Sequence, residues 1–416
     1  MKGKIFILLV IAFMISSILN AKEKNEIIVA ADGTGDVKTI NDAVKLLPMF
    51  NYGRVVIFIK NGVYNEKVRI ERDNITFRGE NREKTIWQYN QLRSDWDNNR
   101  DIIGPGVLNI YADDIIVENL TMENTQPEVG PHAFVIYGFG TRTILQNCNF
   151  ISKGADTVSL WDYKGGMYYH ANCYFEGAVD FVCPRGWCFI KDSKFYEHKA
   201  TAAIWHAGGF NINQKFVIKN SSFDGVKGFE LGRHHYEAQF FLLDCKFSGN
   251  MSDKEIYRVT YPDDPKRDRT FNWGKRYYFY NCNKSGGNPE WMKDNLENAD
   301  GKPVAEEITA EWTFDGKWKP ESIEPPTVEN YKIEGENLYL FFSERVAVIG
   351  EPILRSSIGT TFKFHSGGEN NTVRFTSESN IRIDDLQNLQ IINGEKIIAT
   401  AASVKERYVD LSINKL

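Results

Sequence analysis

The chain has 416 residues and a formal net charge of −5, with an isoelectric point near 5.9. This charge gives no general attraction to nucleic acid or membrane surfaces, so neither is expected as a partner. Hydrophobic residues make up 42% of the chain, which is enough for a large core. The length predicts two domains, unless one domain is elongated or repetitive.

The first 21 residues are expected to form a signal peptide. Lys2 and Lys4 precede an apolar run from Ile5 to Leu19, and polar residues follow before a cleavage site near Ala21. This order is typical of export signals, and a run of about 15 apolar residues is short for a membrane span. We therefore expect an exported protein, periplasmic or extracellular, with no membrane span in its mature form.

A short phrase recurs along the middle of the chain: Asn or Asp, then Cys or Ser, then any residue, then an aromatic residue. From Cys148 the small residue recurs at positions 173, 193, 221 and 245, in steps of 25, 20, 28 and 24 residues. Looser versions begin at Asn74 and Asn119. A strand on one such coil cannot bury its apolar face alone, so successive strands must stack. The repeat predicts an all-β fold, a right-handed parallel β-helix over residues 22–320, with the small and aromatic residues pointing inward.

The six cysteines are expected to be free, buried thiols, although exported proteins ordinarily place cysteines in disulfides. Four of them occupy the small-residue position of the repeat, where cysteine behaves as a small hydrophobe. Cys183 and Cys188 flank Pro184 and Gly186 in a predicted loop. They are the first pair to suspect if a disulfide exists.

The character of the chain changes after Trp318. Prolines punctuate the next segment, and the repeat and the cysteines are absent from Val328 onward. Short alternating runs separated by Gly- and Asn-rich turns predict a small, immunoglobulin-like β-sandwich over residues 327–416. The clearest runs are 337–342, 372–375 and 408–413. This domain shows no catalytic constellation, and a spacer or stability module is preferred over a carbohydrate-binding module.

Three polar residues are spaced by about one coil. His132, Asp156 and Asp180 follow each other at intervals of 24 residues, so they are expected to stack on one face of the solenoid. Two neighbouring carboxylates disfavour double ionisation, which lets one carry a proton while the other remains an anion. The alternative is that each aspartate caps a turn, as single aspartates in loops commonly do.

Five segments, in order along about 250 residues, resemble motifs of the pectin methylesterases of carbohydrate esterase family 8. Each motif alone is a weak signal, but their order makes the resemblance specific. The matching segments are 32–40 (DGTGDVKTI), 62–66 (GVYNE), 155–157 (ADT), 179–182 (VDFV) and 231–233 (LGR).

The resemblance implies a role for each matched residue. Asp180 would be the nucleophile that forms an acyl-enzyme, and Asp156 would be the general acid and then the general base. Arg233 would hold Asp180 ionised and oriented through a charge-assisted contact. The reaction implied by the family needs no cofactor and no metal.

Two departures from the family pattern affect the oxyanion donors. His132 stands where the family has one glutamine, and Ala155 stands where it has a second. A histidine can donate a hydrogen bond, but an alanine side chain cannot, and a lost oxyanion donor costs on the order of 10² to 10³ in rate. Either His132 and another donor compensate, or the reaction has weakened or changed.

A third departure affects the substrate groove. The family's Arg-Pro-Trp becomes Arg233-His234-His235, which removes an aromatic platform. We expect His235 and three aromatic residues to contact sugar rings instead, with ordinary packing as the alternative reading: Trp161, Tyr168 and Trp205. His132, His206, His234 and His235 match no common zinc spacing.

These features predict a monomeric pectin methylesterase that acts on methyl-esterified polygalacturonate and possesses a site adapted to a decorated or branched pectin. Several alternatives remain. One is a β-helix enzyme that hydrolyses another ester or a thioester. Others are a pectin lyase or glycosidase, whose calcium cluster or motif set does not match, and an inactive glycan-binding protein, for which two close carboxylates have little use.

Overall fold

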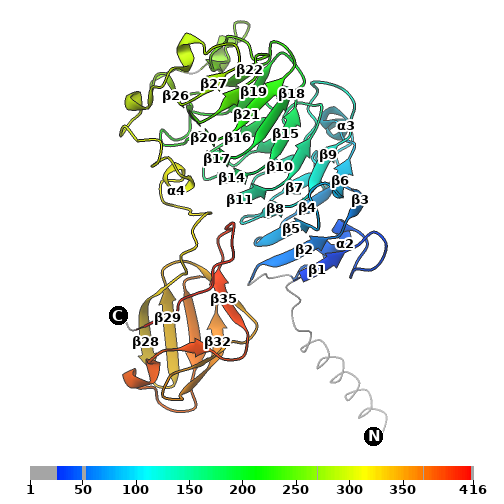
Figure 1. The fold of residues 1–416 in the computed structure, drawn as a ribbon. Helices are drawn as coiled ribbons and strands as arrows, with labels where there is room; N and C mark the ends of the chain where they lie inside the picture. The colour runs from blue at the N-terminus through cyan, green and yellow to red at the C-terminus, as the bar shows by residue number, and fades with distance from the viewer. Residues whose placement is uncertain (1–25, 49–52, 269, 369, 414–416) are drawn as a thin grey trace. The chain divides into compact units, whose positions relative to one another are not determined.

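The computed structural model describes residues 26–48, 53–268, 270–368 and 370–413, so the expected signal peptide lies outside the described residues. The structure is built almost entirely from β-strands (Figure 1). The chain divides into two compact units: residues 26–326 together with 399–408, and residues 327–398 together with the segment from 409 onward. In the described ranges, no helix is long and apolar enough to cross a membrane.

The first unit is a parallel β-helix, as the repeat predicted. Its coils stack into three sheets, here named A, B and C. Sheet A contains ten strands: β1 (Glu26–Val29), β2 (Val55–Ile59), β5 (Ile75–Gly79), β8 (Ile116–Glu118), β11 (Thr143–Gln146), β14 (Met167–Ala171), β17 (Trp187–Lys191), β20 (Phe216–Lys219), β23 (Gln239–Leu243) and β26 (Arg276–Tyr280).

Sheets B and C complete each coil. Sheet B contains nine strands: β3 (Gly62–Asn65), β6 (Thr85–Tyr89), β9 (Thr121–Asn124), β12 (Asn149–Ile151), β15 (Tyr174–Gly177), β18 (Lys194–Glu197), β21 (Ser222–Gly225), β24 (Lys246–Phe247) and β27 (Asn283–Lys284). Sheet C contains eight: β4 (Val68–Ile70), β7 (Leu108–Ile110), β10 (Ile136–Gly138), β13 (Val158–Leu160), β16 (Val182–Pro184), β19 (Ala202–His206), β22 (Glu230–His234) and β25 (Tyr257–Arg258).

The register of sheet B confirms the predicted repeat. Asn149 pairs with Tyr174, and Tyr174 pairs with Lys194. Lys194 then pairs with Ser222, and Ser222 pairs with Lys246. These partners reproduce the predicted steps of 25, 20, 28 and 24 residues, so the recurring phrase marks the same corner of successive coils.

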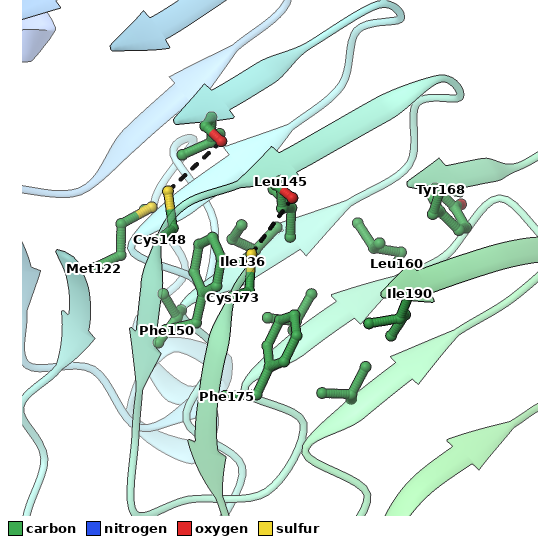
Figure 2. Packing of buried hydrophobic residues seen from close by; sticks show 14 of the residues in the cluster. Met122, Ile136, Leu145, Cys148, Phe150, Leu160, Tyr168, Cys173, Phe175 and Ile190 are labelled. Atoms are coloured by element: carbon green, nitrogen blue, oxygen red, sulfur yellow. Dashed lines mark hydrogen bonds between the residues drawn. The ribbon is translucent and has the colours of Figure 1, made fainter. Parts of the chain in front are cut away.

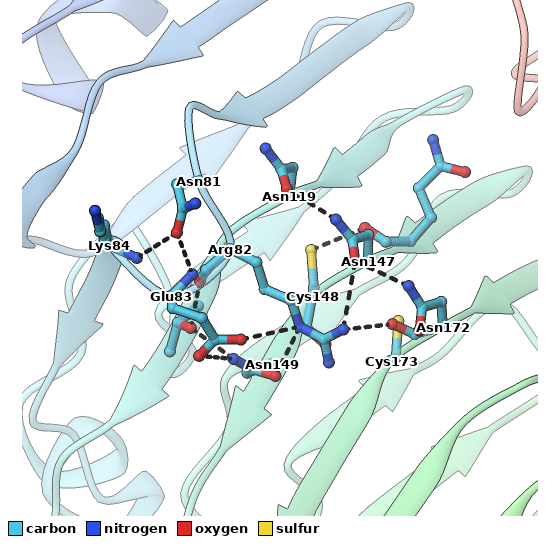
Figure 3. Close-up of polar contacts among 12 residues, drawn as sticks. Asn81, Arg82, Glu83, Lys84, Asn119, Asn147, Cys148, Asn149, Asn172 and Cys173 are labelled. Atoms are coloured by element: carbon cyan, nitrogen blue, oxygen red, sulfur yellow. Dashed lines mark hydrogen bonds and ion pairs between the residues drawn. The ribbon is translucent and has the colours of Figure 1, made fainter.

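The polar residue of the phrase turns the chain from sheet A into sheet B (Figure 3). The Nδ2 of Asn147 donates to Asn119 Oδ1 at 2.8 Å, and the Nδ2 of Asn172 donates to Asn147 Oδ1 at 2.9 Å. The Arg82 guanidinium caps this stack by donating to the carbonyls of Asn172 and Cys148. Asn and Asp tolerate the left-handed backbone that the corner requires, and it is adopted at 119, 147, 172, 192, 220, 244 and 281. Asn74 is an exception to the expected repeat, since it precedes a strand of sheet A.

The core of the coil confirms the inward orientation of the small and aromatic residues (Figure 2). Phe150 and Phe175 are fully buried and stack with ring centroids 5.7 Å apart. Cys148 and Cys173 lie beside them, and the Cys173 thiol points at the Leu145 carbonyl oxygen at 3.4 Å. All six cysteines are buried and free, which confirms that prediction.

Sheet A is also covered on its outer face. A second apolar cluster joins residues of β14 and β17 to Leu296, Phe314 and Trp318, which belong to the segment that follows β26. The loop 399–408 joins this cluster, because Trp318 Nε1 donates to the Ala402 carbonyl at 2.7 Å. Short helices in the described residues are α2 (Ile40–Lys45), α3 (Arg93–Asn98), α4 (Ala310–Thr313), η1 (Pro265–Arg267), η2 (Glu290–Met292), η3 (Leu296–Asn298) and η4 (Ile383–Leu386).

The second unit is the predicted small β-sandwich. A six-stranded antiparallel sheet contains β28 (Val328–Glu334), β29 (Asn337–Phe342), β33 (Thr372–Thr376), β32 (Thr361–Gly367), β31 (Ile353–Arg355) and β34 (Gln390–Ile391). A two-stranded sheet contains β30 (Val346–Ile349) and β35 (Lys396–Ala399), and both sheets contribute to one apolar core.

Two of the three runs predicted in this unit are strands, but the third prediction is wrong. Residues 408–413 form only isolated pairings, such as the bridge between Asp410 and Thr327. Residues 399–408 pack with the β-helix unit instead. The immunoglobulin-like assignment stays a prediction.

Candidate active site

The outward face of sheet C carries a row of polar and aromatic side chains. Side chains alternate along a strand, so Val158 and Val182 point into the core while their neighbours Ser159 and Cys183 point outward. The same register continues through later coils, where Trp205 pairs with Arg233 and Arg233 pairs with Tyr257. The row therefore forms one surface across five coils.

Asp156 and Asp180 occupy equivalent positions at the corner between sheets B and C. Each lies two residues before its strand, and Val158 pairs with Val182, so the two aspartates lie on adjacent coils. The Asp180 amide donates to the Ala202 carbonyl at 2.7 Å. Both residues adopt left-handed backbone conformations, and both are about nine-tenths buried.

The residue before Asp180 is strained. Val179 has a φ of +51°, which is unfavourable for a β-branched residue. Its amide donates to Glu197 Oε1 at 3.3 Å, and the Lys199 amide donates to the same oxygen at 2.9 Å. Glu197 Oε2 is buried and has no hydrogen-bond partner among the described residues. Burial raises the pKa of Glu197 to about 9, so the group is neutral at pH 7.

Arg233 holds Asp180 through two parallel hydrogen bonds. Arg233 Nε donates to Asp180 Oδ1 at 2.8 Å, and Arg233 Nη2 donates to Oδ2 at 2.8 Å. Burial raises the pKa of Asp180 to about 6, although the hydrogen bond and charge of Arg233 act in the opposite direction. The carboxylate is therefore a desolvated anion above that pH, a form suited to nucleophilic attack.

Asp156 is connected to a different set of groups. The Ser159 hydroxyl donates to Asp156 Oδ2 at 3.3 Å, and Ser159 Oγ accepts from Trp161 Nε1 at 2.9 Å. His132 Nε2 lies 3.9 Å from Asp156 Oδ1. His132 is paired with Ala155 rather than with Asp156, so the expected 24-residue alignment is one residue off. The structure nevertheless brings His132, Asp156 and Asp180 together at one corner.

Pro184 interrupts the sheet beside the aspartates. A proline has no amide hydrogen to donate, and β16 pairs with β19 only between Val182 and Ile204. The Gly186 carbonyl, which follows this gap, accepts instead from His206 Nε2 at 2.8 Å. Cys183 and Cys188 lie on the two strands that flank this turn, so their predicted loop is only Arg185 and Gly186.

The side chain of Arg185, which lies in this turn, packs against the aromatic residues of the site. Its guanidinium lies 3.5 Å from the ring centroid of Trp161 and 4.6 Å from that of Trp205. His235 packs edge-on against Trp205 with centroids 5.0 Å apart. Burial, followed by the charges of Arg233 and other arginines, lowers the pKa of His235 to about 4. Two of the expected sugar-contacting residues therefore flank one guanidinium, and a third, His235, packs against the second of them.

The fourth expected contact, Tyr168, is a wrong prediction. Its ring is fully buried in the core, and its hydroxyl accepts from the Asp162 amide at 3.1 Å. It lies on β14 of sheet A, whereas the candidate site lies on sheet C. Two of the histidines considered, His206 and His234, are also buried, with their side chains on the inward face of sheet C.

Sequence reasoning missed three residues of this site: Ser159, Arg185 and Glu197. Ser159 and Glu197 carry no distinctive spacing in the sequence. Arg185 was the most visible signal, since it is the charged residue that follows the apolar run Phe181–Pro184. A buried strand seldom ends in an unpaired charge.

Comparisons with known proteins agree with this architecture. The family profile described as Pectinesterase matches residues 26–221. The chain is 34% identical to Pectinesterase 31 of Arabidopsis thaliana over 163 residues, which are 37% of this chain and 50% of that protein. It is 25% identical to Probable pectinesterase 49 of the same plant over 300 residues, covering 70% of this chain and 80% of that protein. The chain thus spans half the length of the first of these relatives.

Solved structures share the fold. Pectin methylesterase PemA from Erwinia chrysanthemi has a TM-score of 0.56 and 23% identity, covering 72% of this chain and 99% of that one. The pectin methylesterase from carrot has a TM-score of 0.53 and 20% identity, covering 64% and 84%. A pectin methylesterase in complex with a hexasaccharide has a TM-score of 0.56 and 22% identity, covering 73% and 100%. The resemblance inferred from the five motifs is confirmed.

Proposed function

We propose that this chain, whose β-helix resembles those of pectinesterases, hydrolyses methyl esters of galacturonate in pectin. The observation that carries the proposal is the pairing of Arg233 with the buried Asp180 carboxylate, next to Asp156 on the adjacent coil. One carboxylate is held as an oriented anion, and the other is placed to exchange protons. This division of roles is what hydrolysis through a covalent intermediate requires.

In the first half of the reaction, an Asp180 carboxylate oxygen attacks the carbonyl carbon of the methyl ester. The tetrahedral oxyanion collapses, the bond to the methoxy oxygen breaks, and Asp156 gives that oxygen a proton so that methanol leaves. Arg233 orients the attacking carboxylate through its paired N–H groups. The product of this half is an anhydride between Asp180 and the galacturonate.

In the second half, water attacks the galacturonate carbonyl carbon of this anhydride. Asp156, now an anion, takes a proton from the water and is restored to its starting form. The bond to Asp180 breaks, which restores the Asp180 carboxylate and releases galacturonic acid, and the acid then loses its proton to solvent. The Ser159 hydroxyl fixes the rotamer of Asp156 through its hydrogen bond to Oδ2.

We assign stabilisation of the oxyanion to His132, because Ala155 has no side-chain donor. The proximity of its half-exposed ring, within 4 Å of Asp156, supports this assignment. A single donor in place of two predicts a lower rate, by on the order of 10² to 10³ for one lost donor. We propose that the site is suited to a decorated pectin, for which binding contacts outside the reacting ester contribute more.

Methanol release tests the proposed function. We expect wild-type protein to release methanol from methylated homogalacturonan or from a branched pectin, and Asp180→Ala to release none above background. Loss of a nucleophile costs roughly 10⁴ to 10⁶ in rate. No release by wild type from either polymer would contradict the proposal, and glycan binding without turnover would then favour an inactive binding protein.

We also propose that the protein is exported. The order of basic, apolar and small polar segments in residues 1–21 supports this. Sequencing the amino terminus of protein recovered outside the cytoplasm should show a start near Lys22. Retention of Met1 in the mature protein would contradict export through a cleaved signal.

A further inference from the structure

Arg185 is a buried cation that forms no ion pair at contact distance in the described ranges, although its charge lowers the pKa of Asp180. The residue is 8% exposed, and no carboxylate in the described ranges forms an ion pair with it. Its one hydrogen bond to a described residue runs from Nη1 to the Cys183 carbonyl at 3.4 Å. A buried charge is costly unless it is paired and hydrogen-bonded. The site is therefore incomplete in the protein alone.

The guanidinium is held rigidly by two indole rings. Its carbon lies over the Trp161 ring at 3.5 Å and near the Trp205 ring at 4.6 Å. Trp161 is itself fixed by its bond to Ser159, and Pro184 fixes the backbone that precedes Arg185. Stacking uses the faces of the guanidinium and leaves the N–H groups along its edge available to a ligand. Trp205 Nε1 is a second buried donor without a partner among the described residues.

Of the three basic side chains Arg185, Arg233 and His235, Arg185 is the one whose positive charge is available to bind an anion. The paired edge of Arg233 is occupied by Asp180, through its Nε and Nη2 atoms. The lowered pKa of His235 keeps that ring neutral at pH 7. The Nε and Nη2 atoms of Arg185, in contrast, bond to none of the residues that the structure describes. An anion that enters this groove meets Arg185.

Arg185 and Asp180 lie at opposite ends of one strand, near enough for the Arg185 charge to lower the pKa of Asp180. Asp180 precedes β16 and Arg185 follows it, so the two residues reach the groove from opposite ends of one strand. The polymer proposed as substrate carries carboxylates wherever an ester has already been removed. A carboxylate matches the two-pronged edge of a guanidinium, as the Asp180 pair at Arg233 demonstrates in the same groove.

We propose that Arg185 forms a carboxylate-binding subsite that receives a free galacturonate carboxylate near the ester under attack. This inference rests on the proposed function. It predicts that the enzyme prefers partly de-esterified chains over fully esterified ones. The reaction would then assist itself, because each carboxylate that is released creates a ligand for the subsite.

The test compares Arg185→Gln with wild type on two galacturonate oligomers of equal length, one fully methyl-esterified and one partly de-esterified. We expect KM for the partly de-esterified oligomer to rise about 10- to 100-fold, as expected for lost charge-assisted hydrogen bonds. Arg185 lines the same groove and its charge lowers the pKa of Asp180, so activity on the fully esterified oligomer should fall as well, but KM for that oligomer should rise less than KM for the partly de-esterified one. An equal loss on both oligomers would mean that Arg185 stabilises the oxyanion or the fold. No change on either oligomer would mean that Arg185 does not bind the substrate. Either result would overturn the proposal.

Two further variants serve as controls for Arg185→Gln. Arg185→Lys keeps the charge but not the two-pronged edge, so it should retain part of the preference. Arg69→Gln is the matched control, because Arg69 also stacks on an aromatic ring, that of Tyr111 at 3.8 Å, but is already paired with Glu71. Arg69→Gln should leave the ratio of the two KM values unchanged. A shift in that ratio as large as that of Arg185→Gln would overturn the assignment to Arg185.

A binding measurement separates this inference from the proposed function. Fully de-esterified oligogalacturonate carries carboxylates but no ester, so its affinity can be measured by calorimetry without turnover. Wild type should bind it at least tenfold more tightly than Arg185→Gln, whether or not methanol is released from any substrate. Equal affinities would overturn the subsite alone, and absent methanol release would overturn the esterase alone.

Discussion

Two corners of the same coils differ in how they use left-handed residues. At the corner between sheets A and B, asparagines repeat from coil to coil and bond to one another, as Asn147 does with Asn119 and Asn172. At the corner between sheets B and C, Asp156 and Asp180 have the same backbone conformation but carry carboxylates that bond to unlike partners. A repeated corner satisfies its polar groups within the stack. At the other corner, the carboxylates bond to side chains outside the stack.

Polar groups without partners lie at the second corner and at the far ends of the sheet C strands that follow it. Glu197 Oε2 and Trp205 Nε1 are buried and without partners in the described part of the chain, and Arg185 forms no ion pair at contact distance there. Val179 adds a strained backbone. Such features reduce stability, and they gather at functional sites because a ligand or a reaction requires them.

The largest expected effect contrasts one aspartate from each corner. Asp180→Asn removes the nucleophile, so methanol release should fall by roughly 10⁴-fold or more. Asp192→Asn changes the same atoms in the first corner, where Asp192 Oδ1 accepts from Asn220 Nδ2 at 2.6 Å and other coils already use asparagine. We expect it to retain activity within about twofold. Equal losses in both variants would show that the two corners do not differ in function.

The second prediction concerns pH. Asp180 must be ionised to attack, and its pKa is raised to about 6. In the free enzyme, kcat/KM should therefore rise with pH, about tenfold per unit below pH 6, and level off above it. Arg233→Gln removes a charge that lowers this pKa, so the acid limb should move to higher pH. A limb that stays in place in Arg233→Gln would show that another group titrates.

The repeated corner could be predicted from sequence because successive coils carry the same short motif. The Asn-Cys-x-Phe phrase marks a turn, a small core residue and an aromatic core residue together. Because it occurs several times, the start of each coil can be located even where insertions change the length of the coil. The five motifs placed Asp156, Asp180 and Arg233 in the same way. What the sequence could not supply was the environment of residues that occur once, such as Arg185, whose position depends on the gap that Pro184 opens.

Tyr168 was misplaced for a related physical reason. Alternation separates core from surface only where one face of a sheet meets solvent. In β14 the residues Met167 to His170 are all buried. Tyr168 lies in the core of the coil, whereas Met167 and Tyr169 lie under the segment 314–318, which covers the outer face of sheet A. Alternation therefore does not distinguish the inward residue from its outward neighbours. That cover comes from more than 100 residues away, so no local pattern in the sequence reveals it.

The third prediction tests the repeated corner itself. Asn147→Ala places a side chain without an amide in the left-handed region and removes the bonds to Asn119 and Asn172. We expect a loss of about 1–3 kcal/mol in the free energy of unfolding, with kcat unchanged for the folded protein. Asn147→Gly accepts the backbone conformation and should lose less. Chemical denaturation with activity measured in parallel checks both, and a change in kcat would contradict the separation of the two corners.

The last prediction concerns the pH dependence of stability, through Glu197, which supports the strained Val179 amide. Its pKa is raised from 4.5 to about 9, so the folded protein keeps a proton that the unfolded chain releases. The stability that this group contributes is complete below about pH 4.5 and is lost as the pH rises toward 9. Glu197→Gln keeps the accepting oxygen without the titration. The melting temperature of wild type should therefore fall relative to Glu197→Gln between pH 5 and 9, by about 2–4 °C for each kcal/mol lost, whereas the exposed variant Glu290→Gln should follow wild type. Parallel melting curves for wild type and Glu197→Gln would show that Glu197 is ionised at neutral pH, and the second corner would then hold a third negative charge.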